Sequence, residues 1–212
     1  MAELSERSGV AVPTIKFYLR EQLLAAGERT SPNQAAYDER HVDRLRLVRA
    51  LLDVGGLTVS AARDVLAAID NTDMPLDWAF GIAQQALPPV AAGEGDDVEA
   101  QNVEALLAER GWRIDPDNPG RATAARVLAR YERLGLGHLR ETAGEYLRAA
   151  EIVAAADLAA VAAAPDRATQ VETVVVGTVL GDALFAGFRR LAQEQRSHTL
   201  YSPEGTECED PR

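Results

Sequence analysis

The segment Val12–Leu24 constrains the fold of this chain more than any other part of it. It reads VPTIKFYLREQLL, and a proline near the start favours the first turn of a helix. Ile15, Leu19 and Leu23 recur at intervals of four and form one apolar stripe. A helix of this kind fits a DNA groove when its other side binds phosphate, so we expect it to contact DNA. That side carries hydroxyl groups or positive charge, at Thr14, Lys16, Tyr18 and Arg20.

The segments on either side of this helix predict a helix-turn-helix followed by a wing. Upstream, Ser8 and Gly9 interrupt a short helix and give the quick turn into the next helix that a helix-turn-helix needs. Downstream, residues 25–37 read AAGERTSPNQAAY, a run with several turn-forming residues and little apolar content. Such a composition favours a loop or a small β-wing.

Two further helices are predicted after the wing. Residues 38–54 carry apolar side chains at helical spacing, with Asp38 as a good N-cap. Gly55 and Gly56 end that helix, and Thr58 caps the next one, which reads VSAARDVLAAID. Residues 1–70 are therefore predicted to form one winged helix-turn-helix domain.

With its segments in this order, the first third of the chain resembles the MerR family of bacterial transcription regulators. The residues that carry the resemblance are SGVAVPTIKFYLREQLL, a wing that ends in YD, and HVDRLRLVRALLDVGGLTVSAARDVL. The resemblance implies a winged helix-turn-helix that binds double-stranded DNA, with Thr14, Lys16 and Tyr18 at the groove and backbone. It also implies that the wing, at residues 29–34, contacts an adjacent groove.

From the residue pattern and the resemblance together we expect a set of side chains to bind DNA. Thr14 and Lys16 are expected in the groove, and polar groups of the helix and wing on phosphates. Arg44, in the following helix, is expected either at the DNA backbone or on a solvated face. The full set is Thr14, Lys16, Phe17, Tyr18, Arg20, Arg29, Thr30, Asn33, Tyr37 and Arg44.

Several positions depart from the pattern that is usual in the MerR family. An Arg and two Tyr usually follow the Thr-Ile pair, whereas Lys16, Phe17 and Tyr18 follow it here, so Phe17 has no hydroxyl for a phosphate. The usual Gly-Tyr-Arg of the wing is replaced by QAAY, without the Arg. Ala11 stands where a capping Ser is usual, which removes a cap worth about 1 kcal/mol.

Charge is divided unevenly along the chain, whose net charge is −11. Residues 1–70 hold nine Lys and Arg against ten Asp and Glu, and the remaining residues hold 13 against 23. The acidity therefore belongs to the C-terminal part. Because DNA affinity rests largely on neutralising phosphates, a nearly neutral N-terminal part predicts salt-sensitive binding that needs a dimer.

Cysteine content and hydropathy indicate a cytoplasmic protein without a metal site or a membrane span. Cys208 is the one cysteine, so neither a disulfide framework nor a thiolate metal site is expected. The most apolar run, residues 174–185, is short and contains Asp182, and the first residues are too polar for a signal peptide. The sequence holds no plausible catalytic triad or phosphate-binding glycine loop, which predicts that the protein is not an enzyme and needs no cofactor.

The rest of the chain is predicted to be all-α. Residues 71–97 form a connector broken by proline and glycine, with a short helix at 76–87, and residues 98–195 form a helical domain. Residues 196–212 are expected to be a disordered tail. The fold class is thus all-α with a small β-wing: a winged helix-turn-helix DNA-binding domain followed by a helical dimerisation and effector domain. Helices of the second domain are expected at 98–110, 121–136, 138–164 and 167–195.

The last of these helices is the expected dimer interface. It carries a wide apolar strip, and Gly177 and Gly181 permit close approach of a second backbone. An ordinary buried core helix is the alternative interpretation of the same strip. The residues expected to pair with a second copy are Val174, Thr178, Phe185 and Phe188.

Aromatic residues are scarce in the alanine-rich C-terminal part. Trp112, Tyr131 and Tyr146 are predicted to line a pocket for a small-molecule effector, although core packing explains them equally well.

These features predict a cytoplasmic, homodimeric transcription regulator that binds a pseudo-palindromic promoter site. By the family resemblance, the dimer would distort the promoter spacer and act with RNA polymerase. Two alternatives stay open. One is an architectural DNA-binding protein without a regulated promoter, and the other is a protein-interaction module whose helix-turn-helix no longer binds DNA.

Overall fold

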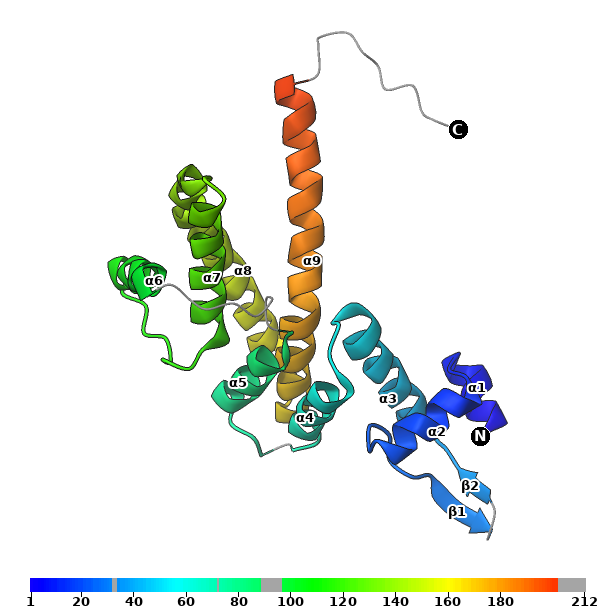
Figure 1. Ribbon diagram of the computed structural model, residues 1–212. Coiled ribbons are helices and arrows are strands. Elements are labelled where there is room, and N and C mark those ends of the chain that lie inside the picture. Colours follow the sequence, from blue (N-terminus) through cyan, green and yellow to red (C-terminus); the bar gives the residue numbers. More distant parts are fainter. Residues whose placement is uncertain (32–33, 72, 89–96, 202–212) are drawn as a thin grey trace.

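The computed structural model describes residues 1–31, 34–71, 73–88 and 97–201 of the chain. Its N-terminal part is a winged helix-turn-helix unit, which lies to one side of the molecule (Figure 1). The predicted order of short helix, turn, second helix and β-wing is confirmed. In chain order the unit begins with α1 (Ala2–Ser8), α2 (Val12–Arg20), β1 (Glu28–Ser31), β2 (Gln34–Ala36) and α3 (Glu39–Arg49).

Helix α2 is held by its apolar side. It begins at Val12 without a side-chain cap, as expected from Ala11, and Pro13 occupies the first turn, where a proline costs no hydrogen bond. Ile15 and Tyr18 are buried in the core of the unit, so the opposite side of α2 faces away from the protein.

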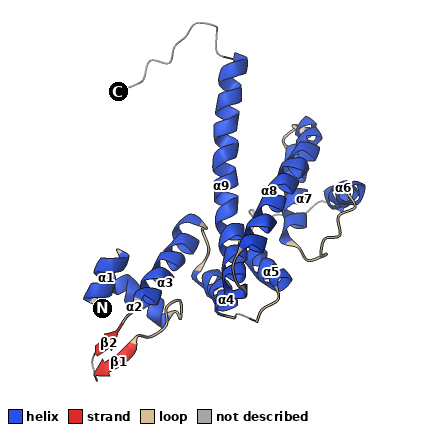
Figure 2. Ribbon diagram, turned by 180° about the vertical axis from the view of Figure 1, so that it is seen from behind, coloured by secondary structure: helices blue, strands red, loops and turns tan. Residues whose placement is uncertain are grey.

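The wing is a short antiparallel hairpin in which Arg29 pairs with Ala35. Gly27 makes the close approach of its two ends possible, because a Cβ atom there would lie 2.9 Å from Tyr37 Cε1 and closer still to the carbonyl oxygen of Ala36. Figure 2 shows that the wing contains the strands of the described chain and that the other elements are helical.

Helix α3 begins at the predicted cap. The Asp38 carboxylate accepts a hydrogen bond from the backbone N–H of His41 at 3.3 Å, and His41 Nδ1 accepts one from the backbone N–H of Asp38 at 3.2 Å. In the other tautomer His41 Nδ1 carries a proton and donates it to the Asp38 carboxylate, 2.6 Å away, and this hydrogen bond lowers the pKa of Asp38. The helix continues into a π-helical turn, η1 (Ala50–Val54), which the sequence pattern did not indicate.

Gly55 and Thr58 end that helix and start the next, as predicted. The Thr58 hydroxyl accepts a hydrogen bond from the backbone N–H of Ala61 at 3.2 Å and caps α4 (Val59–Asp70). Gly55 is required for packing, because a Cβ atom there would lie 2.7 Å from the Leu51 carbonyl oxygen and would overlap Val179 Cγ1.

The C-terminal part contains five α-helices and one 3₁₀ segment within the described residues. Helix α9 runs to Tyr201, six residues past its expected end, because no glycine or proline interrupts QRSHTLY. The expected helix 138–164 is divided into a 3₁₀ turn and an α-helix. The elements are α5 (Leu76–Ala86), α6 (Asp97–Glu109), α7 (Pro119–Arg133), η2 (Gly137–Thr142), α8 (Ala143–Ala163) and α9 (Arg167–Tyr201).

The base of α9 completes the core of the N-terminal unit. Val175 and Val179 are buried in the same apolar cluster as Ile15, Leu45 and Leu51. Figures 1 and 2 both show the lower end of α9 beside α4 and α5, while its upper half rises clear of them. Apolar packing therefore does not stop at residue 70, where the sequence suggested a domain boundary.

Two smaller apolar clusters hold the remaining helices. Ala79 of α5, Val161 of α8 and Val171 and Val174 of α9 form one of them. The other joins α6 to α7 and includes Val103 and Leu107, with Leu128 opposite. Val174, expected to pair with a second copy, is thus already covered inside this chain.

Helix α9 also meets the length and composition of a membrane-crossing helix. Such a match is weak, because core helices of soluble proteins meet the same criteria. The four valines buried at the base of α9 are packed against other parts of this chain, which is the arrangement of a core helix.

Val179→Ala is expected to lower the free energy of unfolding by about 1.5–3 kcal/mol, because two methyl groups leave a buried, closely packed position. Urea unfolding, followed by far-ultraviolet circular dichroism, measures the change. Leu200→Ala is the control, since Leu200 lies on the same helix but is exposed, and its effect should stay within about 0.5 kcal/mol. Equal midpoints for the Val179 variant and the unmodified chain would contradict the packing described above.

Candidate nucleic-acid interface

The exposed side of α2 carries the first group of expected DNA-binding residues. Lys16 and Arg20 are exposed and Thr14 is half-exposed. The Arg20 guanidinium lies over the Phe17 ring, 5.3 Å from its centroid. Phe17 thus positions a neighbouring positive charge through its ring face, a role that does not need the missing hydroxyl.

Tyr18 points the other way. It is only 6% exposed and belongs to the core of the unit. Burial raises the pKa of Tyr18, and the negative charge of Asp53 raises it further while Arg49 acts in the opposite sense. The ring therefore supports α2 from behind, and the structure does not bring it onto the exposed face with Lys16.

The wing presents Arg29 to solvent. Neighbouring residues of a strand point to opposite faces, so Arg29 and Glu28 project from different sides of β1. Thr30 lies in β1, and Asn33 lies outside the described residues. Tyr37 packs edge-on against His41 with ring centroids 5.1 Å apart, which fixes the wing to the start of α3.

Arg44 is a structural link. Its two terminal nitrogens donate to the Asp70 carboxylate at 2.9 and 2.6 Å, and Nε donates to the Leu23 carbonyl oxygen at 3.0 Å. Its side chain is only 18% exposed. Arg44 therefore connects the segment after α2 with α3 and α4, and its guanidinium is already occupied.

A second arginine, which sequence reasoning missed, completes this link. Arg63 Nε donates to the Glu21 carbonyl oxygen at 2.9 Å, and Nη2 donates to the Glu21 carboxylate at 3.2 Å. Since Glu21 directly follows α2, Arg63 and Arg44 together attach the C-terminal end of α2 to α4. The 42-residue separation of Arg63 and Glu21 left no local signal in the sequence.

The acidic residues of this unit are largely neutralised away from the exposed side of α2. Glu39 pairs with Arg7, Asp43 with Arg46 and Asp53 with Arg49. Among the described residues, no ion pair includes Lys16 or Arg29. The unit has almost no net charge, yet its α2 and wing side keeps cations that are free to meet an anion.

Arg40 is a further exposed cation near the wing that sequence reasoning left out. It lies in the first turn of α3, three residues after Tyr37. The inward positions Val42 and Leu45 were enough to place Arg40 on the outer side of that helix, so a signal for it was present.

The N-terminal part of the chain is similar to known transcription regulators. Residues 1–69 match the MerR HTH family regulatory proteins. The chain is 42% identical over 77 residues to nodulation protein NolA of Bradyrhizobium elkanii, covering 36% of this chain and 33% of NolA. It is 29% identical over 73 residues to the mercuric resistance operon regulatory protein of Bacillus cereus, covering 34% of this chain and 54% of that protein.

A solved structure extends the likeness along the chain. The crystal structure of SCO5550 from Streptomyces coelicolor A3(2), a proposed transcriptional regulator, is 34% identical and covers 96% of this chain and 98% of that one, with a TM-score of 0.66. The chain belongs to the MerR family of transcriptional regulators. This MerR regulator spans about a third of the length of NolA, whereas it matches SCO5550 through the C-terminal helices as well.

The C-terminal part of this MerR regulator contains a second candidate site. Tyr131 and Tyr146, two of the residues expected at an effector pocket, line one apolar cavity. Trp112 lies outside the lining of that cavity, and its indole N–H donates to Glu151 Oε1 at 3.2 Å. No group of three His, Cys, Asp or Glu close enough to hold a metal ion occurs among the residues that the structure describes.

The residues expected at the dimer interface differ in their burial. Val174 is buried and Thr178 is half-buried near the base of α9, whereas Phe185 and Phe188 are exposed higher on this helix. A second copy could therefore reach the upper pair of residues and not the lower pair.

Arg44→Ala is expected to destabilise this MerR regulator by about 1–2 kcal/mol, because three hydrogen bonds of a largely buried guanidinium are lost. Chemical unfolding measures the change. Arg46→Ala is the matched control on α3, since its ion pair with Asp43 is exposed and is worth less than about 0.5 kcal/mol. Equal effects of the two variants would rule out the linking role of Arg44.

Proposed function

We propose that this MerR regulator binds double-stranded DNA through α2 and the wing and acts as a homodimeric regulator of transcription. The observation that carries the proposal is the pair Lys16 and Arg29, exposed cations that form no ion pair with any described residue, beside arginines that are ion-paired within the unit. A helix-turn-helix places such residues against the groove and the phosphates.

The proposed contacts follow from exposure where the structure describes the side chain, and from the sequence pattern at Thr30 and Asn33. Thr14 and Lys16 enter the major groove, and Arg20 meets phosphate with its guanidinium held over Phe17. Arg29, Thr30 and Asn33 of the wing are proposed to contact the backbone beside the groove, together with Arg40. Tyr18 and Arg44 act indirectly, by holding α2 at its angle to α3, and Tyr37 does the same for the wing.

The net charge of −11 is compatible with DNA binding because most of the acidity lies outside residues 1–70. Charges separated by more than about 8 Å are largely screened at physiological ionic strength. Binding is therefore governed by the cations on α2 and the wing, and it weakens steeply with salt, as phosphate contacts require.

Lys16→Ala is expected to weaken binding to the DNA upstream of the protein's own gene and to reduce the slope of log K against log salt by about 1–2 per dimer. Fluorescence anisotropy with a labelled duplex at several salt concentrations measures both quantities. Arg46→Ala, whose charge is paired with Asp43, should leave the slope unchanged. An unchanged slope for the Lys16 variant would show that Lys16 does not neutralise DNA charge and would contradict its place at the DNA.

The same experiment separates the alternatives. An architectural protein would bind the upstream DNA and an unrelated duplex with similar affinity. A protein-interaction module would bind neither duplex, even in dilute buffer.

The homodimer is proposed to form through the upper half of α9. Leu184, Phe188 and Leu191 recur on one face of the helix and are 59%, 60% and 62% exposed. Three large apolar side chains on one exposed helix face are unfavourable in water, and such a surface is typical of a protein–protein interface. A two-fold dimer would set two recognition helices on half-sites about 34–36 Å apart.

Phe188→Asp combined with Leu191→Asp is expected to shift the protein to monomers and to lower its DNA affinity, because charge replaces apolar surface at the interface. Analytical ultracentrifugation measures the mass of the particle. Gln193→Asp is the control, since Gln193 is exposed on the other side of the same helix. A double variant that stays dimeric would place the interface elsewhere.

Regulation is proposed to follow the family resemblance. The dimer distorts the promoter spacer in the cytoplasm, RNA polymerase reads the changed DNA shape, and a small-molecule effector modulates the response. Transcription from the upstream promoter, measured with and without the protein, decides between activation and repression.

A further inference from the structure

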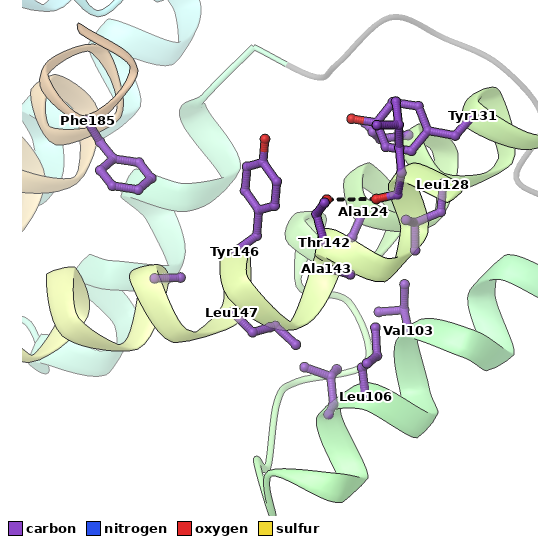
Figure 3. A pocket seen from close by; sticks show the side chains of 14 residues that line it. Val103, Leu106, Ala124, Leu128, Tyr131, Thr142, Ala143, Tyr146, Leu147 and Phe185 are labelled. Carbon is purple, nitrogen blue, oxygen red and sulfur yellow. Dashed lines mark hydrogen bonds between the residues drawn. The ribbon is translucent and has the colours of Figure 1, made fainter. Parts of the chain in front are cut away.

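One apolar pocket lies where α6, α7, η2, α8 and α9 converge (Figure 3). Its volume is about 380 Å³, which is within the range of small-molecule sites. Aliphatic side chains form most of its wall, and aromatic rings stand at Tyr131, Tyr146 and Phe185. Figure 3 shows Phe185 reaching toward Tyr146 from a different helix.

The chemistry of the wall selects the ligand. Among the residues that the structure describes, no charged side chain lines the pocket, so a charged ligand would lose its hydration without gaining a partner. Thr142 Oγ1 already donates to the Leu139 carbonyl oxygen at 2.7 Å, and Tyr146 accepts a hydrogen bond from Arg189. Within the described residues no hydrogen bond includes the Tyr131 hydroxyl, so the polar groups of the wall are a few hydroxyls, of which Tyr131 is the one without a partner. A neutral, mostly apolar molecule with an aromatic ring fits this wall.

Helix α9 connects the pocket with the winged helix-turn-helix unit. Phe185 lines the pocket, and Val179, six residues earlier on the same helix, packs against Gly55 at the end of η1. Six helical residues span about 9 Å, and no break divides α9 between them. A shift of α9 at Phe185 therefore reaches the core beneath α2 without passing through a loop.

Arg189 strengthens the connection at the pocket. Its guanidinium lies over the Tyr146 ring, 5.3 Å from the centroid, and donates a hydrogen bond to the Tyr146 hydroxyl. This contact joins α9 to α8 beside the pocket. A molecule that inserts between Tyr146 and Phe185 changes the spacing of the two helices.

We propose that the pocket binds a neutral, mainly apolar aromatic molecule and that α9 transmits its binding to the winged helix-turn-helix unit. The second half of this proposal rests on the proposed DNA binding, because its output is a change in DNA affinity. Coupling between two sites in a protein commonly amounts to a factor of about 5–150 in affinity.

Binding is tested with a matched pair of fluorescent probes and the full chain. N-phenyl-1-naphthylamine is neutral, and 1-anilinonaphthalene-8-sulfonate carries the same rings with a negative charge. The neutral probe is expected to bind saturably, one per chain, at least tenfold more tightly than the sulfonate. Absence of saturable binding, or equal affinity for both probes, overturns the assignment of the pocket.

Variants then locate the probe. Leu106→Trp fills the pocket from α6 and is expected to weaken binding of the neutral probe at least tenfold, while Phe185→Ala removes the α9 wall and weakens it less. Leu158→Ala is the control, because Leu158 is an exposed apolar residue of α8 outside the pocket. Circular dichroism confirms that each variant is folded. Equal loss in the control, or dissociation of the dimer by the probe, means that the probe occupies another surface and overturns the proposal.

Coupling is tested by measuring DNA affinity with and without the neutral probe. At saturation the DNA dissociation constant is expected to change at least fivefold, and DNA must change the affinity for the probe by the same factor. Phe185→Ala should abolish this change. Binding of the probe without any effect on DNA affinity overturns transmission through α9. A chain that binds the probe in the pocket but binds no duplex refutes the proposed function and leaves the pocket in place.

Discussion

Val179 of α9 packs against Gly55 at the point where the winged helix-turn-helix unit would otherwise expose its core. The contact requires a residue without a side chain after η1 and a branched apolar residue near the base of a long helix. The apolar support of α2 includes this contact, since Leu51 and Ile15 belong to the same cluster as Val179. Helix α9 thus belongs at its base to the core of the winged helix-turn-helix unit, and at Phe185 it lines the pocket.

The positively charged residues of the N-terminal unit have two different roles. Arg44 and Arg63 hold the segment after α2 through hydrogen bonds to backbone and carboxylate oxygens, so these cations serve structure. Lys16 and Arg29, by contrast, are exposed and form no ion pair within the described residues. A net charge near zero can therefore conceal a surface suited to phosphate.

Local signals explain what the sequence predicted well. The caps at Asp38 and Thr58, the proline of α2 and the turn-rich wing act within a few residues, and each appears where it was expected. The position of Tyr18, three residues after Ile15, was a local signal for its burial, whereas the ion pair between Arg44 and Asp70 depends on a partner distant in sequence, which periodicity does not reveal. Periodicity also did not reveal that α9 packs on the N-terminal unit. For the same reason Val174 was predicted at a dimer interface, although α5 and α8 cover it.

The shared core has a consequence for how the protein is made. Val179 lies 128 positions after Leu51, its partner in the cluster, so this contact cannot form while only the N-terminal unit has left the ribosome. Contacts of such long sequence separation slow folding and prolong the exposure of apolar surface. The end of the chain that emerges first is thus completed by one of its last helices, and a nascent fragment lacking α9 would be a natural client for chaperones.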